Sequence, residues 1–412
     1  MNRLPVPSAG AGQTPPAYQL HELVAYALHL GTTGFGGPVA LVGAMHRDLV
    51  ERRGWISEAE YKEGLTLSQL MPGPLAAQLA IYLGYVHHGI WGATLVGLAF
   101  VLPSFLMVVA LGWAYVAYGG LSWMQGVFYG VGSAVIGIIA LSAWKLTQKT
   151  IGRDRLLGGI YLVSALVTLI TETEYVLIFL AGGLLVWLAR SGRLPGIPQG
   201  AAAMVPGLLA AHVPGIDLPL DALLVQIGLF FTKAGAFVFG SGLAIIPFLY
   251  GGVVKEYGWL SDQEFLDAVA VAMITPGPVV ITVGFIGYLV AARGGDALSG
   301  LAGASVAALA TFLPCYLLTI LPAPYFRKYG KLPGLVAFVD GVTAAAVGAI
   351  TGACLVLGRR TLIPAGSSLE VPKLLLLLAT LAILLKFRKV PEPVIIAGAA
   401  ILGLVIHPFV AR

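Results

Sequence analysis

Ionisable and small polar side chains beside glycines, inside strongly apolar segments, are the residues of this sequence best suited to chemistry. Lys233 lies two residues after a pair of phenylalanines, and His29 occupies the equivalent place 204 residues earlier. A charged side chain in an apolar segment is costly, so Lys233 is predicted to contact a negatively charged ligand unless it reaches an aqueous interface. His29 can change its charge near neutral pH, which suits either that ligand or a proton.

Glycine–proline segments close to these residues occur twice. Met71-Pro72-Gly73-Pro74 aligns with Thr275-Pro276-Gly277-Pro278, and Phe35-Gly36 aligns with Phe239-Gly240, in both cases 204 residues apart. Proline fits the first position of a helix, where its missing N–H has no intrahelical partner to lose. Glycine allows close backbone approach and positive φ angles. These segments therefore predict helices that break and then restart.

Each restarting helix presents unpaired backbone N–H groups and the positive end of its dipole. Several such ends around one cavity favour an anion, and most of all a compact dianion. Glycines, hydroxyls and amides near the breaks are predicted to complete the site. The alternative is that the hydroxyls bind carbonyls freed by the breaks and the glycines allow close helix packing. The predicted ligand-binding residues are His29, Thr32, Thr33, Gly36, Gly37, Gln69, Gly73, Gln78, Lys233, Gly240, Ser241, Thr275, Gly277 and Thr282.

Asp340 is an acidic residue within a continuous apolar run, 335–342, and its counterpart in the first half is Tyr129. It is predicted to carry a proton, together with His29, or to be the counter-ion of Lys233. A capped helix end near the surface is the structural alternative.

Other polar motifs are better explained by structure. Ser57-x-x-Glu60 and Ser261-x-x-Glu264 have the spacing of capping boxes at helix starts. Glu63 and Asp267 are also matched, and they either guard an entrance or lie on solvated helix faces. Cys315 and Cys354 lack metal-ligand spacing, and we expect neither a metal nor a cofactor.

Composition defines the elements that must position these residues. Of 412 residues, 58% are hydrophobic and only 10% are charged, and several apolar stretches exceed the roughly 20 residues needed to cross a bilayer. The chain is therefore predicted to be an all-α polytopic membrane protein. Its net charge of +5 comes from loop residues and does not indicate a nucleic-acid partner.

The repeated motifs divide the chain into two homologous halves. We expect a disordered tail over 1–19, a first repeat over 20–195, a linker over 196–218 and a second repeat over 219–412. Each repeat should hold broken or re-entrant helices followed by about four continuous transmembrane helices. The bias of Lys and Arg among the loops reverses between the halves, which favours inverted repeats, although Arg359 and Arg360 fall on the opposite side of that arrangement.

The combination of motifs resembles the chromate ion transporter family, in particular its long two-domain members. The resemblance covers about Leu20 to Phe409. It implies proton-driven efflux of chromate from the cytoplasm across the cytoplasmic membrane, chromate resistance and antiparallel halves. The second half has Gly242 where the first has Pro38, so the two half-sites need not contribute equally. The matching segments are Gly34-Phe35-Gly36-Gly37-Pro38, Gly54-Trp55-Ile56-Ser57, Met71-Pro72-Gly73-Pro74, Phe239-Gly240-Ser241-Gly242 and Thr275-Pro276-Gly277-Pro278.

Several alternatives stay open at this point. Sulfate shares the charge and shape of chromate, and transport by anion exchange or through a passive channel fits the same motifs. An intramembrane enzyme is disfavoured because the sequence has no metal-ligand cluster, paired membrane carboxylates or nucleophile–base motif. A homodimer is expected only by analogy with other transporters.

Overall fold

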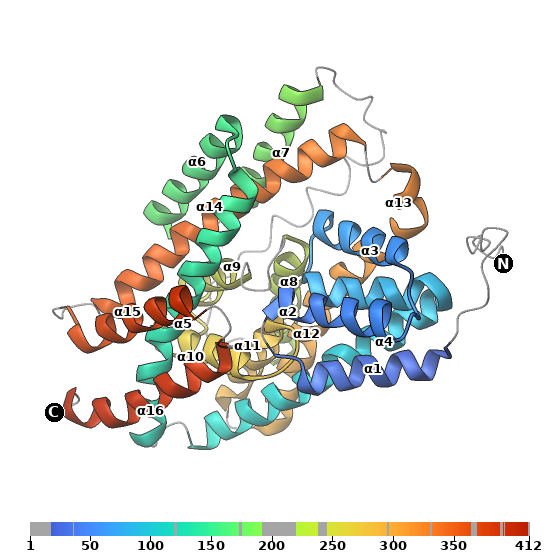
Figure 1. The fold of residues 1–412 in the computed structure, drawn as a ribbon. Coiled ribbons are helices and arrows are strands. Elements are labelled where there is room, and N and C mark those ends of the chain that lie inside the picture. The colour runs from blue at the N-terminus through green and yellow to red at the C-terminus, as the bar shows by residue number, and fades with distance from the viewer. Residues whose placement is uncertain are drawn as a thin grey trace.

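The computed structural model describes residues 18–35, 37–118, 122–172, 175–191, 220–237, 245–294, 296–329, 332–363, 369–387, 390 and 392–410. These residues form helices joined by short turns, without a strand among them (Figure 1). The all-α architecture is therefore confirmed. Apart from Tyr18 and Gln19, the predicted tail lies outside the described residues, as does the linker.

The first repeat begins with interrupted helices and ends with longer ones. Its elements are α1 (Leu20–Thr33), α2 (Gly37–Met45), the π-helix η1 (His46–Arg52), α3 (Glu58–Leu70), α4 (Leu75–Tyr118), α5 (Ser122–Ile151), α6 (Arg155–Thr171) and α7 (Val176–Ser191). Gly89, with φ of 59°, kinks α4 and separates a short arm from the following span.

The second repeat follows the same plan, including a π-helix at the matching place. Its elements are α8 (Leu220–Phe237), α9 (Ile245–Tyr250), the π-helix η5 (Gly251–Glu256), α10 (Asp262–Ile274), η6 (Val279–Ile281), α11 (Thr282–Ala291), η7 (Ala292–Gly294), α12 (Ala297–Ile320), α13 (Ala323–Tyr329), α14 (Pro333–Leu362), α15 (Val371–Lys386) and α16 (Glu392–Val410). The short helix α13 was not predicted from the sequence.

Five helices of the described chain are long and apolar enough to cross a membrane. They cover Leu75–Tyr118, Gln125–Ile151, Ala297–Phe326, Val336–Leu362 and Glu392–Phe409. Shorter apolar helices accompany them, so the breaks are followed by about four continuous helices in each repeat, as predicted.

The predicted capping boxes are confirmed. Ser57 accepts a hydrogen bond from the Glu60 amide at 3.2 Å, and Glu60 accepts one from the Ser57 amide at 2.9 Å. Ser261 and Glu264 form the same pair at 3.2 and 2.7 Å. Both boxes start the helix that leads into a Pro-Gly break, so they fix the direction from which α3 and α10 approach it.

Close packing of small residues holds the first helix of each repeat against its long span. A Cβ on Gly31 would lie 2.2 Å from the Phe100 carbonyl oxygen, and one on Gly235 would lie 2.1 Å from that of Thr311. The α1–α4 contact is thus repeated by α8–α12, and neither glycine can be enlarged without moving a helix.

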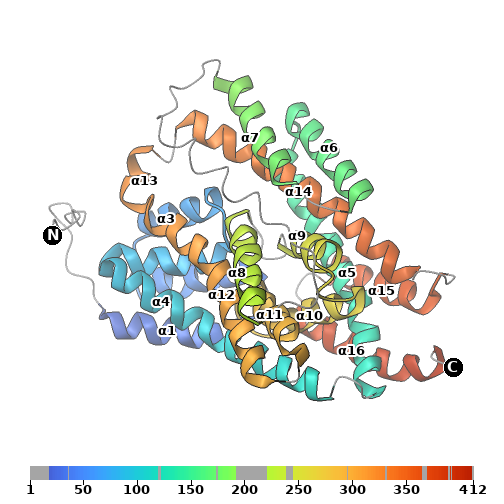
Figure 2. The same ribbon diagram turned by 180° about the vertical axis from the view of Figure 1, so that it is seen from behind.

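The later helices of the two repeats also pack against each other. Helix α14 lies along α6 and α7, while α5 packs against α14, α15 and α16 (Figures 1 and 2). The breaks, in contrast, lie among α1–α4 and α8–α12. Helices α5–α7 and α14–α16 therefore form a second contact region between the repeats, beside the region that contains the breaks.

Candidate functional site

The breaks of the two repeats are in direct contact. The amide of Gly277, in the Pro-Gly break before η6, donates a 2.8 Å hydrogen bond to the carbonyl oxygen of Gly34, which follows α1. Repeat symmetry would pair Gly73 with position 238, which lies outside the described residues. The predicted convergence of helix breaks is therefore seen directly at one contact between the repeats.

Each Pro-Gly break is also packed by a small side chain from the other repeat. At Gly277, which has φ of +96°, a Cβ would lie 1.9 Å from the Ser104 hydroxyl oxygen. At Gly73, which has φ of +141°, it would lie 3.0 Å from the Cys315 sulfur. Ser104 and Cys315 occupy equivalent positions in α4 and α12. The contact is thus crossed, with each long span filling the break of its partner repeat.

A proline immediately precedes each of these two side chains. Pro103 lies inside α4 and Pro314 lies inside α12. A proline in a helix removes the amide donor for the carbonyl four residues earlier. A carbonyl oxygen without an amide donor is therefore expected in both long spans near the breaks, and as an acceptor it suits a hydrogen-bond donor and not an anion.

Threonine hydroxyls near the breaks donate to backbone carbonyls. Thr32 and Thr33 donate to Leu28 and His29 at 2.7 and 2.8 Å. Thr275 donates to Ala272 at 3.2 Å, and Thr282 to Ala268 at 2.9 Å. In this conformation the four hydroxyls cannot also donate to an anion, because a hydroxyl has one hydrogen. Their role as ligands stays a prediction.

The two predicted amides differ in their surroundings. Gln78 is fully buried, and its Nε2 donates to the Pro72 carbonyl at 2.7 Å, which closes the first Pro-Gly break. Its Oε1 has no partner among the described residues. Gln69 is exposed. Gly36, Gly240 and Ser241 lie outside the described residues, and Gly37 begins α2.

Lys233 and His29 have different environments despite their equivalent positions. Lys233 is half-buried, and its Nζ lies 5.9 Å from the ring centroid of Phe248, without a carboxylate partner in the part of the chain that the structure describes. His29 is exposed on α1. Lys233 therefore has no ion pair to break among the described residues, and its role as a ligand stays a prediction.

Asp340 does not pair with Lys233. Its carboxylate contacts the Arg190 guanidinium at 2.5 Å, and Arg190 also binds Asp154 at 2.7 Å. The counter-ion of Asp340 is therefore Arg190, and the pair connects α14 to α7. Sequence reasoning could not find it, because 150 residues separate the partners.

A different carboxylate lies buried close to the breaks. Asp267 of α10 is only 3% exposed, so a solvated helix face does not explain it. It accepts hydrogen bonds from the Tyr115 hydroxyl and the Gln263 amide, both at 2.8 Å. No Lys or Arg of the described chain forms an ion pair with it. Its place between Leu266 and Ala268 was the available signal in the sequence.

The capping glutamate of each repeat contacts a basic side chain. His87 Nε2 lies 3.0 Å from Glu60, and the Tyr18 hydroxyl contacts His87 Nδ1 at 2.8 Å. In the second repeat Arg293 contacts Glu264 at 3.3 Å. In both repeats a basic side chain contacts the capping glutamate, but it is an imidazole in the first repeat and a guanidinium in the second.

Comparison with known proteins decides the family. The chromate transporter family matches residues 21–187 and again 225–404. The chain belongs to the chromate transporter family. The two matched ranges also confirm that it consists of two homologous halves.

Relatives within this family match almost end to end. A chromate transport protein of Cupriavidus metallidurans is 64% identical over 408 residues, covering 97% of this chain and 96% of that protein. A probable chromate transport protein of Synechococcus elongatus is 60% identical over 392 residues, with 95% and 96% covered. A chromate transport protein of Pseudomonas aeruginosa is 30% identical over 409 residues, with 96% and 94% covered. No solved structure matches the chain.

Proposed function

We propose that this protein exports chromate from the cytoplasm across the cytoplasmic (inner) membrane and so confers chromate resistance. Support comes from full-length relatives that are called chromate transport proteins, at 64% and 60% identity. A multi-pass membrane protein with two homologous halves, each containing helix breaks, is the architecture of a secondary transporter.

The hydrogen bond from Gly277 to Gly34 is the observation that carries the mechanism. It occupies a backbone donor at a break, in a place where an anion would need that donor. Because the two residues belong to different repeats, movement of one repeat against the other would break this bond. We infer that the arrangement described here is closed, and that separation of the breaks exposes the N–H groups to chromate.

Positive charge for the site is assigned to Lys233, with the predicted glycines, hydroxyls and amides as neutral partners. A dianion in a low-dielectric site requires compensation by a cation or by several aligned N–H groups. Lys233 has no carboxylate partner to displace among the described residues, so it can approach the ion without breaking an ion pair.

Proton coupling is the second part of the proposal. Asp267 is a buried carboxylate with neutral partners, the arrangement expected of a group that carries a proton within a membrane protein. Asp340 and His29 remain the proposed alternatives. Asp340, however, already neutralises Arg190, and His29 is exposed.

Chromate uptake into proteoliposomes of the purified protein, with an imposed pH gradient and sulfate as competitor, tests the proposal. Saturable uptake that collapses without the gradient establishes proton-coupled transport. Uptake that ignores the gradient but requires internal sulfate establishes anion exchange. Uptake without saturation indicates a passive channel, and absence of chromate uptake contradicts the proposed cargo. Mass measurement of the detergent-solubilised protein tests the proposed homodimer.

A further inference from the structure

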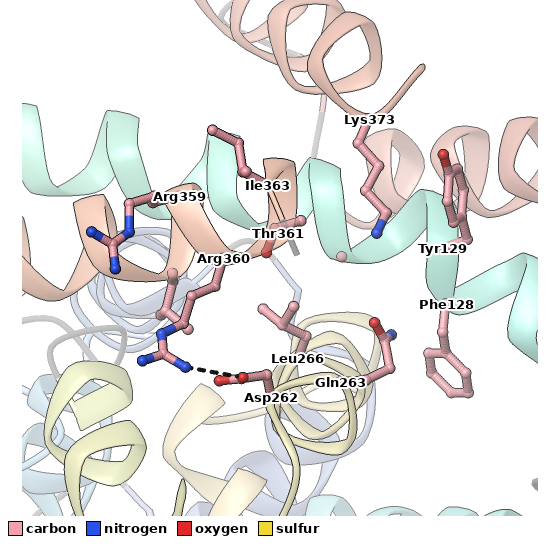
Figure 3. Close-up of a pocket in the computed structure, with 12 residues that line it drawn as sticks. Phe128, Tyr129, Asp262, Gln263, Leu266, Arg359, Arg360, Thr361, Ile363 and Lys373 are labelled. Carbon is pink, nitrogen blue, oxygen red and sulfur yellow. Dashed lines mark hydrogen bonds and ion pairs between the residues drawn. The ribbon is translucent and has the colours of Figure 1, made fainter. Parts of the chain in front are cut away.

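A cavity of about 360 Å³ lies between α5, α10, α14 and α15, away from the contact between the breaks (Figure 3). Among the described residues, three basic side chains line it, Arg359, Arg360 and Lys373, and one acidic side chain, Asp262. Such a volume lies within the range of small-molecule sites and leaves room for a tetrahedral oxyanion together with water.

Two of the three cations extend into this space. Figure 3 shows the Lys373 side chain extending from α15 on the side of Tyr129. It also shows Arg360 pointing toward Asp262 at the start of α10. The Lys373 side chain is only 12% exposed, and its Nζ lies 4.8 Å from the ring centroid of Tyr129. A lysine held this far from solvent is positioned to meet an anion that enters the cavity.

Buried polar atoms without partners supply the second, independent observation. Thr361 lines the cavity and is 6% exposed, yet its hydroxyl has no hydrogen-bond partner among the described residues. The Nε of Arg360 is likewise buried without a partner there. Native proteins rarely leave buried donors unsatisfied. A hydroxyl and a guanidinium N–H at one cavity together call for a ligand rich in acceptor oxygens.

Carboxylates around the cavity compensate its cations in part. Asp262 binds Arg360 at 3.2 Å, while Glu172 contacts Arg360 and binds Arg359 at 3.6 Å. Glu370 binds Lys373 at 3.0 Å. Since these pairs already neutralise much of the charge, an anion competes with fixed carboxylates. The cavity is therefore suited to weak, reversible binding.

The cavity and the breaks lie at opposite ends of α10. Asp262 and Leu266 line the cavity, and the 13-residue helix ends at Ile274, just before the Pro-Gly break. At 1.5 Å per residue, the end of α10 lies about 12 Å along the helix from Leu266 and about 18 Å from Asp262. The cavity is thus a separate location, and the buried Asp267 lies between it and the break.

We propose that this cavity is a second oxyanion site, where Lys373, Arg360 and Thr361 bind the oxygens of a tetrahedral anion. A free anion such as sulfate and the phosphate of a lipid headgroup share this chemistry. The proposal rests on the proposed function in one respect: if the ligand is a free anion, it belongs to the same chemical class as the transported ion. Binding, and not transport, is therefore the property to measure.

Equilibrium dialysis of labelled sulfate against the purified full-length protein in detergent tests the site. Thr361→Val removes the hydroxyl at nearly constant shape, and Lys373→Gln removes one cation. Arg153→Gln is the matched control, since Arg153 is exposed and outside the cavity. We expect each cavity variant to lose one of two bound sulfates, or to bind it at least about tenfold more weakly, while the control is unchanged.

A parallel measurement distinguishes the two sources of the anion. Native mass spectrometry of the same proteins, with phosphatidylglycerol added, reports retained lipid. Loss of lipid in both cavity variants supports the oxyanion site with a headgroup as its ligand. Sulfate and lipid retained as in the wild type by both variants, with circular dichroism confirming their folding, overturns the proposal. Lys233→Ala separates the two hypotheses, because it should empty the central site and leave the cavity filled.

Discussion

His87 contacts Glu60 at 3.0 Å, at the same place in the first repeat where Arg293 contacts Glu264 in the second. The imidazole belongs to α4 and the guanidinium to η7. Each Ser-x-x-Glu box is therefore tied to a helical segment that follows the Pro-Gly break of its own repeat.

Replacing His87 with glutamine should raise the pKa of the Glu60 carboxyl. The hydrogen bond with His87 is the largest cause that lowers this pKa from 4.5 to about 2; burial opposes it, and hydrogen bonds from Ser57 add to it. A carboxyl with a lowered pKa stabilises the folded state above its unfolded pKa, and this contribution is lost as pH falls through the folded value. Below about pH 4.5, we therefore expect the melting temperature of the wild type to fall more steeply than that of His87→Gln, with His21→Gln, at an exposed position of α1, as the control. Parallel acid limbs for the wild type and His87→Gln would contradict the assignment.

Gly277→Ala should abolish transport. Its φ of +96° is unfavourable for alanine by about 1–2 kcal/mol, and the new Cβ would lie 1.9 Å from the Ser104 oxygen. We expect chromate uptake below about a tenth of the wild-type rate, since 1.4 kcal/mol corresponds to a factor of ten. Gly398→Ala in α16, where nothing lies within 4 Å of the new Cβ, should behave as wild type.

Adding Ser104→Gly to Gly277→Ala separates the two causes. The double variant removes the collision with Ser104 but keeps the backbone strain. Partial recovery of the melting temperature is expected, and full recovery of both stability and transport would show that backbone conformation at position 277 is unimportant.

Asp267→Asn should uncouple transport from protons. Asparagine can still form hydrogen bonds with Tyr115 and Gln263. Unlike a carboxylate, however, its amide does not take up and release a proton. We expect chromate movement in proteoliposomes to lose its response to an imposed pH gradient while the protein stays folded. Asp340→Asn is the comparison. If Asp340→Asn alone removes the response, the proton carrier is Asp340.

Lys233→Ala should abolish dianion binding at the central site. Lys233 has no carboxylate partner among the described residues, so its removal leaves no unpaired carboxylate behind. We therefore expect the variant to lose only the attraction between the ammonium and the dianion, which weakens binding by about tenfold or more. Lys386→Ala at the end of α15, whose Nζ lies 5.7 Å from the Phe387 ring, controls for removal of a lysine near an aromatic ring. Wild-type affinity and transport in Lys233→Ala would exclude Lys233 from the site.

Glu172 gives a pH prediction outside the membrane-spanning helices, because it follows the end of α6. Burial raises the pKa of its carboxyl, but contacts with Lys255 and Arg360 outweigh burial and bring the pKa below the ordinary 4.5. A carboxyl with a lowered pKa stabilises the folded state above its unfolded pKa, and this contribution disappears as pH falls through the folded value. Below about pH 4.5, the melting temperature of the wild type should therefore fall more steeply than that of Glu172→Gln.

The control for this prediction is Asp221→Asn, at an exposed position in the first turn of α8. It removes an acid without a described ion pair, so its acid limb should follow that of the wild type. A Glu172→Gln protein with the same slope as the wild type would show that the Glu172 network contributes little to stability.

The breaks, the repeats and the capping boxes could all be predicted, because each depends on neighbouring residues. Pro-Gly-Pro segments stop a helix wherever they occur, and Ser-x-x-Glu caps the next one within a single turn. Matching positions in the two halves then place the breaks near each other without any knowledge of side-chain contacts.

Pairings between distant segments could not be predicted. Arg190 meets Asp340 across 150 residues, and Arg360 meets Asp262 across 98. The apolar neighbours of Asp267 distinguish it from Glu63, which occupies the same place in the first repeat and is half-buried, but its partner Tyr115 lies 152 residues away. The cationic cavity likewise exists only after α14 and α15 pack against α5 and α10.

The hydrogen bond between Gly34 and Gly277 has a consequence for any protein built from a single repeat. Donor and acceptor come from different halves, and Ser104 and Cys315 each pack against the break of the other half. One repeat made as a separate polypeptide would contain half of every one of these contacts. Two such polypeptides would have to assemble before an ion could be held between them, so subunit association would itself become a condition for activity.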